Sequence, residues 1–329
     1  MKVTVTNTAL LNTGDAAIMA GTEETLRRAF GPDVEIAVRD QQPALAAEAY
    51  PRYSCGGLFY DQAAEHFGAA GAKLGMILLL GTALASRTPL RKVAARLLPK
   101  PLAHNLAGFV ESDLVVSAGG TYLVPHYRTG PKLLELLVAR FAGIPYVLFT
   151  QSLGPFREKR RLARWLLDGA AAILVREQRS VDHLREIGVP TERVHICADA
   201  AFAMPIETPP EQSPRNEPSI GISVRHWPHF DGDPDAGMDR YLDAVARLTA
   251  VLIEEHGAAV TFISTCQGQA GYWTDDSRTA EEVLQRLPSH LHERARVDTE
   301  FRGPEELCRT LAGYDLYVST RMHLSLIHI

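Results

Sequence analysis

Several features are scarce in this 329-residue chain, and each scarcity narrows the class of protein. There are four cysteines, none spaced as C-x-x-C and none near histidines at a spacing that binds zinc. We therefore expect free thiols in a reducing cytosol and no metal site. The 34 basic and 39 acidic residues give a net charge of -5, so the composition offers no basic field for nucleic acid.

Long hydrophobic runs are also missing. The N-terminal residues 1–11 predict a strand, because a signal peptide would begin with a basic segment followed by a longer apolar run. The most apolar stretch, residues 74–85, is shorter than the roughly 20 residues needed to span a bilayer. The residues that follow it, up to 100, are basic and amphipathic. Two interpretations of 74–100 remain: a core helix, or a peripheral helix resting on anionic lipid.

What is present is typical of a globular α/β protein. The chain is 46% hydrophobic and 22% charged, and its length favours two domains. Continuous apolar runs alternate with helical patterns, which indicates parallel sheets covered on both faces. The strands that we expect lie at 3–6, 34–38, 112–120, 145–152, 172–177, 193–198, 219–225, 258–265 and 315–319.

One segment interrupts this rhythm. Residues 205–219 contain five prolines, several carboxylates and no apolar periodicity, which is typical of a linker. We therefore predict an N-terminal Rossmann-like domain at 1–204 and a C-terminal one at 220–329. In open parallel sheets, ligands bind at the carboxyl ends of the strands, so polar residues just after strands are the candidates for a site.

The first candidates follow the first strand. Asn12, Gly14 and Asp15 stand where that strand turns into a helix, whose free N–H groups suit an anion or a sugar hydroxyl. Asp15 has two interpretations, as the cap of this helix or as an acceptor of a proton from a hydroxyl. A dinucleotide site is not indicated, because the G-x-G-x-x-G pattern is absent.

Three further places in the first domain carry candidates. Gly119 and Gly120 follow a buried strand directly, so they form either a tight turn or a place where a ligand approaches the backbone. His126 lies shortly downstream, and Gln151 lies at the end of the strand at 145–152. We expect these residues to face the ligand cleft.

In the second domain, two arginines follow two predicted strands. Arg225 follows the strand at 219–225, and Arg321 and His323 follow the strand at 315–319. Arginine suits bidentate binding of carboxylate or phosphate, and histidine can donate a proton at neutral pH. The pattern favours a compact anion site with an acid, over a surface position for the histidine.

Taken together, these segments resemble the polysaccharide pyruvyl transferase family. They span nearly the whole chain in the order of that family, and the segments TQSLGPF, VREQRSVDHLREIGV and STRMHLSLI are the more specific ones. The matching segments are NTGDAAI, SAGG, TQSLGPF, VREQRSVDHLREIGV, ADAAFAMP, SVRHW and STRMHLSLI.

The resemblance implies a fold and an activity. Such enzymes resemble GT-B glycosyltransferases, with two Rossmann-like domains, and move the enolpyruvyl part of phosphoenolpyruvate onto a sugar, most often as a ketal. It assigns Arg225, Arg321 and His323 to donor binding and catalysis, and Asn12, Asp15 and the two glycines to the acceptor side. His323 is then the expected general acid and Asp15 the expected base. Phosphoenolpyruvate is the co-substrate, and neither a metal nor another cofactor is expected.

Members of the family continue beyond the point that corresponds to residue 329, so we expect the second domain to be incomplete. The acceptor is expected to be a glycan or a lipid-linked glycan, reached in the cytoplasm or at the inner face of the membrane. Two other functions remain open: a GT-B glycosyltransferase that uses a nucleotide sugar, and a catalytically silent glycan-binding paralogue.

Overall fold

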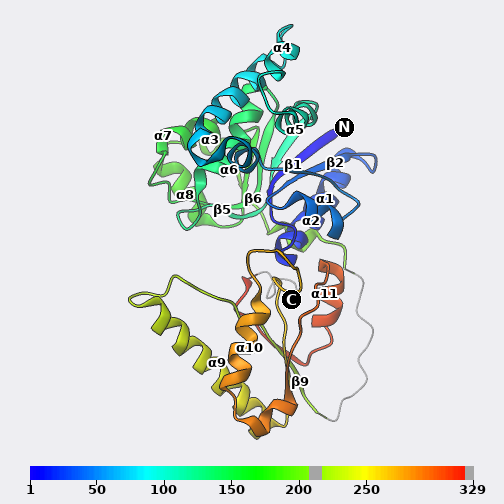
Figure 1. Cartoon of the computed structure of the whole chain (residues 1–329), viewed down its shortest axis with the longest axis vertical. Helices are drawn as coiled ribbons and strands as arrows, with labels where there is room; N and C mark the ends of the chain where they lie inside the picture. Colours follow the sequence, from blue (N-terminus) through cyan, green and yellow to red (C-terminus); the bar gives the residue numbers. More distant parts are fainter. Residues whose placement is uncertain (207–216, 323–329) are drawn as a thin grey trace. The chain divides into compact units, whose positions relative to one another are not determined.

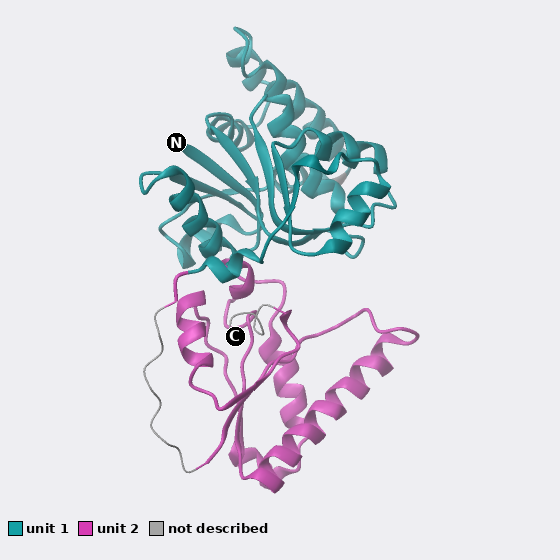
Figure 2. Cartoon of the chain, turned by 180° about the vertical axis from the view of Figure 1, so that it is seen from behind, with its two compact units in different colours: residues 1–10, 18–204 teal, residues 11–17, 205–329 magenta. Residues whose placement is uncertain are grey.

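Two separate parallel sheets organise the chain in the computed structural model, which describes residues 1–206 and 217–322. The chain divides into two compact units (Figure 2). Unit 1 comprises Met1–Leu10 and Ile18–Met204, and unit 2 comprises Leu11–Ala17 and the chain from Pro205. The segment Leu11–Ala17 departs from the division predicted from the sequence, which placed it in the first domain.

Unit 1 contains an eight-stranded parallel sheet whose main path runs β3-β2-β1-β4-β6-β7-β8, with β5 paired to β6. Its strands are β1 (Lys2–Thr8), β2 (Glu35–Asp40), β3 (Ser54–Gly57), β4 (Leu114–Ser117), β5 (Gly120–Leu123), β6 (Tyr146–Leu153), β7 (Ala172–Val175) and β8 (Val194–Ile196). Its helices are α1 (Thr13–Phe30), α2 (Pro43–Ala49), α3 (Phe59–Ala85), α4 (Arg91–Ala95), α5 (Lys100–Val110), α6 (Thr129–Phe141), α7 (Arg160–Asp168) and α8 (Gln178–Glu186), with short 3-10 turns at Thr191–Arg193 and Ala200–Ala203. The first residues of α1 lie in the segment grouped with unit 2.

Helices cover both faces of this sheet. Figure 1 shows α3, α6, α7 and α8 gathered on one side and α1 and α2 on the other. Strand order reverses at β1, because the chain moves from β1 to β2 and β3 in one direction and places β4 on the other side of β1. The carboxyl ends of β1 and β4 therefore form the topological switch point of unit 1, the place where parallel sheets bind ligands.

Unit 2 contains a four-stranded parallel sheet in the order β11-β10-β9-β12. Its strands are β9 (Ser219–Ile222), β10 (Ala259–Phe262), β11 (Ala295–Val297) and β12 (Leu316–Val318), and its helices are α9 (Pro234–His256), α10 (Asp276–Arg286) and α11 (Pro304–Leu311), with a 3-10 turn at Ser289–Arg294. The switch point here lies between β9 and β12, because β10 and β11 extend from the other side of β9. Ile222, Val260 and Phe262 are among the buried side chains of its core.

The predicted fold class, two α/β units with parallel sheets, is confirmed. Three short strands, β3, β5 and β11, are additions to the predicted set. The predicted strands at 219–225 and 258–265 end earlier, at Ile222 and Phe262, so the polar residues behind them lie in loops. Most of the predicted linker, residues 207–216, lies outside the described residues.

The stretch 74–85 forms the last part of α3. Gly68 interrupts this helix with φ 70° and ψ 168°, so the helix has two parts with a kink between them. Leu79 and Ala83 are buried in the core of unit 1, whereas Leu74, Ile77 and Leu84 are exposed. No helix within the described residues is long and apolar enough to cross a membrane.

Candidate functional site

The switch point of unit 2 is held together by hydroxyl groups from the two loops that follow β9 and β12. The Thr320 N–H donates to Ser223 Oγ at 2.9 Å, and the Thr320 hydroxyl donates to the Ser223 carbonyl at 3.0 Å. The hydroxyls of Ser223 and Ser319 lie 3.2 Å apart. These bonds fix the two loops relative to each other, and each loop continues into one of the predicted arginines.

Tyr241, on α9, joins the same two loops from the side. Its hydroxyl accepts a hydrogen bond from the Arg225 N–H and donates to Thr320 Oγ1, both at 3.3 Å. Burial raises the pKa of this hydroxyl, so Tyr241 stays a neutral donor. The Arg225 guanidinium lies 4.7 Å from the ring centroid of Trp227, within cation–π range. The predicted donor residue Arg225 is thus half-buried at the carboxyl end of β9.

Arg321 meets a carboxylate that sequence reasoning did not identify. Its Nε donates to Asp276 Oδ2 at 2.8 Å, and its Nη2 donates to Asp276 Oδ1. The Asp276 side chain is 1% exposed and also accepts a hydrogen bond from the Ser264 hydroxyl at 2.5 Å. Two of the five N–H donors of the guanidinium are therefore committed to Asp276, and Nη1 donates no hydrogen bond within residues 1–206 and 217–322.

A buried thiol lies among these charges. Burial raises the pKa of Cys266 to about 12, and the groups whose charges act on it include Arg321, Asp276 and Asp15. The thiol is therefore neutral near pH 7 and is not activated as a nucleophile. The charges of the predicted residues Asp15 and Arg321 thus both act on this one thiol of unit 2.

The segment 11–17 belongs to unit 2 because backbone groups of unit 2 bind it. The Thr13 N–H donates to the Thr265 carbonyl at 2.9 Å, and the Thr13 hydroxyl donates to the Arg302 carbonyl at 2.8 Å. Asn12 caps the helix, since its Oδ1 accepts from the Gly14 N–H at 3.0 Å, and its Nδ2 donates to Asp15 Oδ2 at 2.8 Å. Asn12, not Asp15, is thus the N-cap of α1, and the Asn12 amide fixes the Asp15 carboxylate through a hydrogen bond.

The switch point of unit 1 carries a second polar cluster, centred on Ser117. Gln151 Nε2 donates to Ser117 Oγ at 2.7 Å and to the Ala118 carbonyl at 2.6 Å. Asn7, in the left-handed region at φ 64°, donates to the same Ser117 Oγ at 3.3 Å. Both amide side chains are fully buried, and neither amide oxygen has a hydrogen-bond partner among the described residues. Unpaired buried acceptors are uncommon and mark this cluster as a candidate for ligand binding.

The predicted glycines lie beside this cluster. A Cβ at Gly119 would come within 2.4 Å of Thr150 Oγ1, and Gly120 has φ 117°, so neither position accommodates a side chain without strain. His126 lies at the surface. His323 lies outside the described residues.

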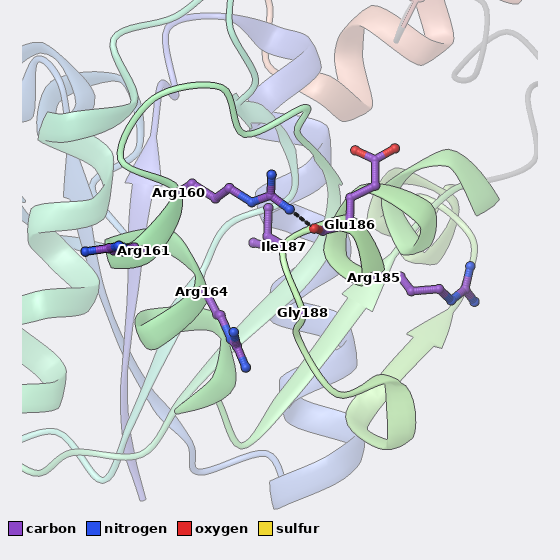
Figure 3. A pocket seen from close by; sticks show the side chains of 7 residues that line it. All are labelled: Arg160, Arg161, Arg164, Arg185, Glu186, Ile187 and Gly188. Atoms are coloured by element: carbon purple, nitrogen blue, oxygen red, sulfur yellow. Dashed lines mark hydrogen bonds between the residues drawn. The ribbon is translucent and has the colours of Figure 1, made fainter.

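A surface hollow of about 360 Å³ in unit 1 is lined mainly by arginines, but it does not form an anion site. Figure 3 shows the side chains of Arg161, Arg164 and Arg185 pointing in different directions. Arg160 donates to the Glu186 carbonyl in the last turn of α8, which is a helix-capping contact. No group of His, Cys, Asp and Glu that could hold a metal occurs in the part of the chain that the structure describes.

Comparison with known proteins gives a family. The family model for polysaccharide pyruvyl transferase matches residues 12–327. The amylovoran biosynthesis protein AmsJ of Erwinia amylovora is 27% identical over 275 residues. That alignment covers 74% of this chain and 65% of AmsJ, so the chain spans slightly less than two thirds of that relative.

Solved structures resemble the fold at low sequence identity. Anabaena HepE, solved with UDP and glucose, matches with a TM-score of 0.52 and 14% identity, over 96% of this chain and 73% of HepE. The UDP-GlcNAc 2-epimerase of Neisseria meningitidis, bound to UDP-GlcNAc, matches with a TM-score of 0.55 and 11% identity, over 98% of this chain and 79% of the epimerase. At these identities the likeness concerns the fold alone.

Proposed function

The chain belongs to the polysaccharide pyruvyl transferase family, and we propose that it transfers the pyruvyl group of phosphoenolpyruvate to a sugar of a polysaccharide or its precursor. The observation that carries this proposal is the family match over 12–327. The similarity to AmsJ supports a role in polysaccharide biosynthesis. The positions of Arg225 and Arg321 at the unit 2 switch point are consistent with a site for a small, multiply charged anion.

The donor is a compact anion with a phosphate and a carboxylate. Arg225 and Arg321 both follow strands that end at the switch point of unit 2, where phosphoenolpyruvate would find two guanidinium groups. Asp276 neutralises part of the charge of Arg321 but fixes its plane through two hydrogen bonds. We therefore assign Nη1 of Arg321 as a preoriented hydrogen-bond donor to phosphoenolpyruvate, and Arg225 as the second cation of this site.

The chemistry requires an acid and a base. Protonation of C3 of phosphoenolpyruvate by His323 gives an oxocarbenium-like centre at C2, which a sugar hydroxyl attacks while Asp15 accepts the hydroxyl proton. Phosphate then departs with cleavage of its C2–O bond, and a second hydroxyl attacks C2 and passes its proton to the departing phosphate, which closes the ketal. The acceptor is a glycan or a lipid-linked glycan, and the reaction takes place in the cytoplasm.

Substitutions at the donor site test these roles. We expect Arg225→Ala to raise the KM for phosphoenolpyruvate about 10-fold to 100-fold, because one charge-assisted bond to the donor is lost. We expect His323→Ala to lower kcat at least about 100-fold with little change in KM. Phosphate release is the readout, and Arg247→Ala on the exposed side of α9 serves as the control. Unchanged turnover in His323→Ala would remove the histidine from the mechanism.

The alternative is a GT-B glycosyltransferase that uses a nucleotide sugar. HepE was solved with UDP and glucose, and the Neisseria epimerase was solved with UDP-GlcNAc. The two functions differ in the donor consumed. Release of a nucleoside diphosphate from a UDP-sugar, without phosphate release from phosphoenolpyruvate, would favour the alternative. Glycan binding with turnover of neither donor would favour a silent paralogue.

A further inference from the structure

Part of unit 1 exposes an unusual combination of apolar and basic side chains. Eighteen large hydrophobic residues are exposed in the described chain, and a third of them lie within 74–97. These six are between 56% and 67% exposed, and we call the surface they form the α3–α4 face: Leu74, Ile77, Leu84, Leu90, Val93 and Leu97. Soluble monomers rarely cluster exposed apolar side chains in this way unless the surface binds something.

The spacing of these residues makes two helical stripes. Leu74, Ile77 and Leu84 lie on the solvent side of α3, opposite the buried Leu79 and Ala83. Leu90 and Val93 are three residues apart, and Leu97 follows four residues later, so this second stripe lies along α4 and its flanks. Each stripe is therefore a continuous apolar face that the fold does not cover.

The two stripes belong to one ordered surface. The Thr82 hydroxyl on α3 lies 3.2 Å from the Ala94 carbonyl on α4, and Leu98 is buried in the same core as Leu79. Figure 1 shows α4 at the end of α3, at the extremity of unit 1. The exposed side chains are thus presented by a framework that is already folded, so little order has to be gained when they bind.

The charged residues within the sequence stretch that carries the face have one sign. Residues 66–110 contain no Asp or Glu, although the whole chain has 39 acidic residues among 329. The same stretch has six lysine and arginine residues: Lys73, Arg87, Arg91, Lys92, Arg96 and Lys100. None of the six forms an ion pair or hydrogen bond with another side chain within the described ranges. Arg87 donates to a backbone group, the Gly143 carbonyl. This local positive charge stands against a net charge of -5.

We propose that the α3–α4 face docks on an anionic lipid bilayer. Apolar stripes flanked by lysine and arginine are typical of helices that lie in the headgroup region, where basic groups meet anionic lipid while leucine and isoleucine enter the acyl boundary. The cores of protein–protein interfaces are depleted in lysine instead. Docking would hold unit 1 at a membrane surface without any helix crossing it, and it is a property separate from the donor chemistry of unit 2.

Vesicle flotation tests this surface. With the full chain and vesicles of phosphatidylcholine containing phosphatidylglycerol, we expect binding at low salt that falls as salt rises, and little binding to phosphatidylcholine alone. Arg91→Glu/Arg96→Glu is expected to weaken partitioning at least about 30-fold, because each basic residue near an anionic surface contributes about fivefold. Ile77→Asp/Val93→Asp is expected to abolish flotation.

Matched controls come from the exposed side of α9. Arg240→Glu/Arg247→Glu and Leu248→Asp/Val251→Asp make the same kinds of change, at arginine and at branched aliphatic residues, outside the face and should float like the wild type. Circular dichroism and thermal unfolding report the folding of each variant, and the salt titration of the wild type needs no variant. Absence of flotation at low salt would overturn the inference, and so would an equal loss of flotation in the α9 control variants. Dimerisation of the chain that Ile77→Asp/Val93→Asp abolishes would also overturn it, because the face would then bind a second copy of the chain. Flotation requires no turnover, so its failure is separate from a failure of pyruvyl transfer.

Discussion

At the scale of single residues, the buried carboxylate of Asp276 organises the donor side of the molecule. It receives two hydrogen bonds from Arg321 and one from Ser264, and its side chain is almost completely enclosed. A charge in such a position is tolerated because three hydrogen bonds satisfy the carboxylate, and removing its charge leaves the guanidinium of Arg321 buried without a counterion. Asp276 thus sets the orientation of a residue proposed to bind phosphoenolpyruvate.

Asp276→Asn should therefore lower the free energy of unfolding by about 3–5 kcal/mol, the usual cost of breaking a buried ion pair from one side. Urea denaturation measures this loss. The matched control is Asp275→Asn at the adjacent position, where the carboxylate caps α10 by accepting from the Ser277 N–H. Asparagine caps equally well, so the control should change stability by less than about 0.5 kcal/mol. Equal effects at both positions would mean that Asp276 has no special structural role.

A second buried carboxyl, Glu135 on α6, makes the stability of unit 1 depend on pH. Burial raises its pKa from the ordinary 4.5 to about 7, although hydrogen bonds from the Phe59 N–H and the Thr6 hydroxyl oppose the shift. The folded state therefore holds this proton more tightly than the unfolded chain does. The stability contributed by the protonated group is complete below pH 4.5 and is lost as pH rises through about 7.

Between pH 4.5 and pH 8 the wild type should lose about 3 kcal/mol more unfolding free energy than Glu135→Gln, whose neutral amide cannot ionise. Urea denaturation of both proteins at several pH values gives the difference, which cancels the titration of all other groups. Parallel curves for the two proteins would show that Glu135 does not titrate in this range.

The predicted site residues and their hydrogen-bond partners show which parts of the site could be predicted from the sequence. Arg225 and Arg321 were identified because polar residues after parallel strands meet at one edge of the sheet. Asp276 is 45 residues from Arg321 in sequence, at the start of a helix where an acidic residue is common, so no local pattern singled it out. Asn7 was missed because it lies inside β1, in a left-handed conformation that the strand pattern hides.

At the scale of elements, the break in α3 is the clearest sequence-encoded irregularity. Gly68 has φ 70° and ψ 168°, a backbone conformation that only glycine adopts readily, and a Cβ there would meet no atom within 4 Å. Any effect of a substitution at Gly68 must then come from the backbone and not from a clash. Gly81, later in the same helix, also has open space around a Cβ but no positive φ.

Gly68→Ala should therefore destabilise the chain by about 1–3 kcal/mol, whereas Gly81→Ala should stabilise it by up to about 1 kcal/mol through higher helix propensity. Thermal and urea unfolding of the two variants measure both changes. Stabilisation by Gly68→Ala would show that α3 runs straight through this position in solution.

Long elements with strong periodicity were predictable, and short ones were not. The pattern of α9 and the apolar run of β6 each identify one kind of structure. β3 has the sequence SCGG and β11 has ARV, and neither sequence favours a strand. They are extended because β3 pairs with β2 and β11 pairs with β10, and such pairing between distant segments cannot be read from the local sequence.

At the scale of the whole molecule, the grouping of Leu11–Ala17 with unit 2 changes how the candidate residues are assigned. The resemblance to the pyruvyl transferase family assigned Asn12 and Asp15 to the acceptor side, and the sequence placed both in the first domain. Hydrogen bonds from Thr13 to Thr265 and Arg302 group this segment with the unit that carries both arginines. The proposed base therefore belongs to the same compact unit as the two arginines proposed to bind the donor.

The identity of the transferred group tests the proposed function most directly. Incubation of the chain with carbon-13-labelled phosphoenolpyruvate and an acceptor glycan, followed by NMR and mass spectrometry of the glycan, follows the pyruvyl carbons themselves. Pyruvyl transfer predicts labelled ketal carbon on the glycan and an equimolar amount of free phosphate. An unlabelled glycan, together with release of UDP when a UDP-sugar replaces phosphoenolpyruvate, would contradict it.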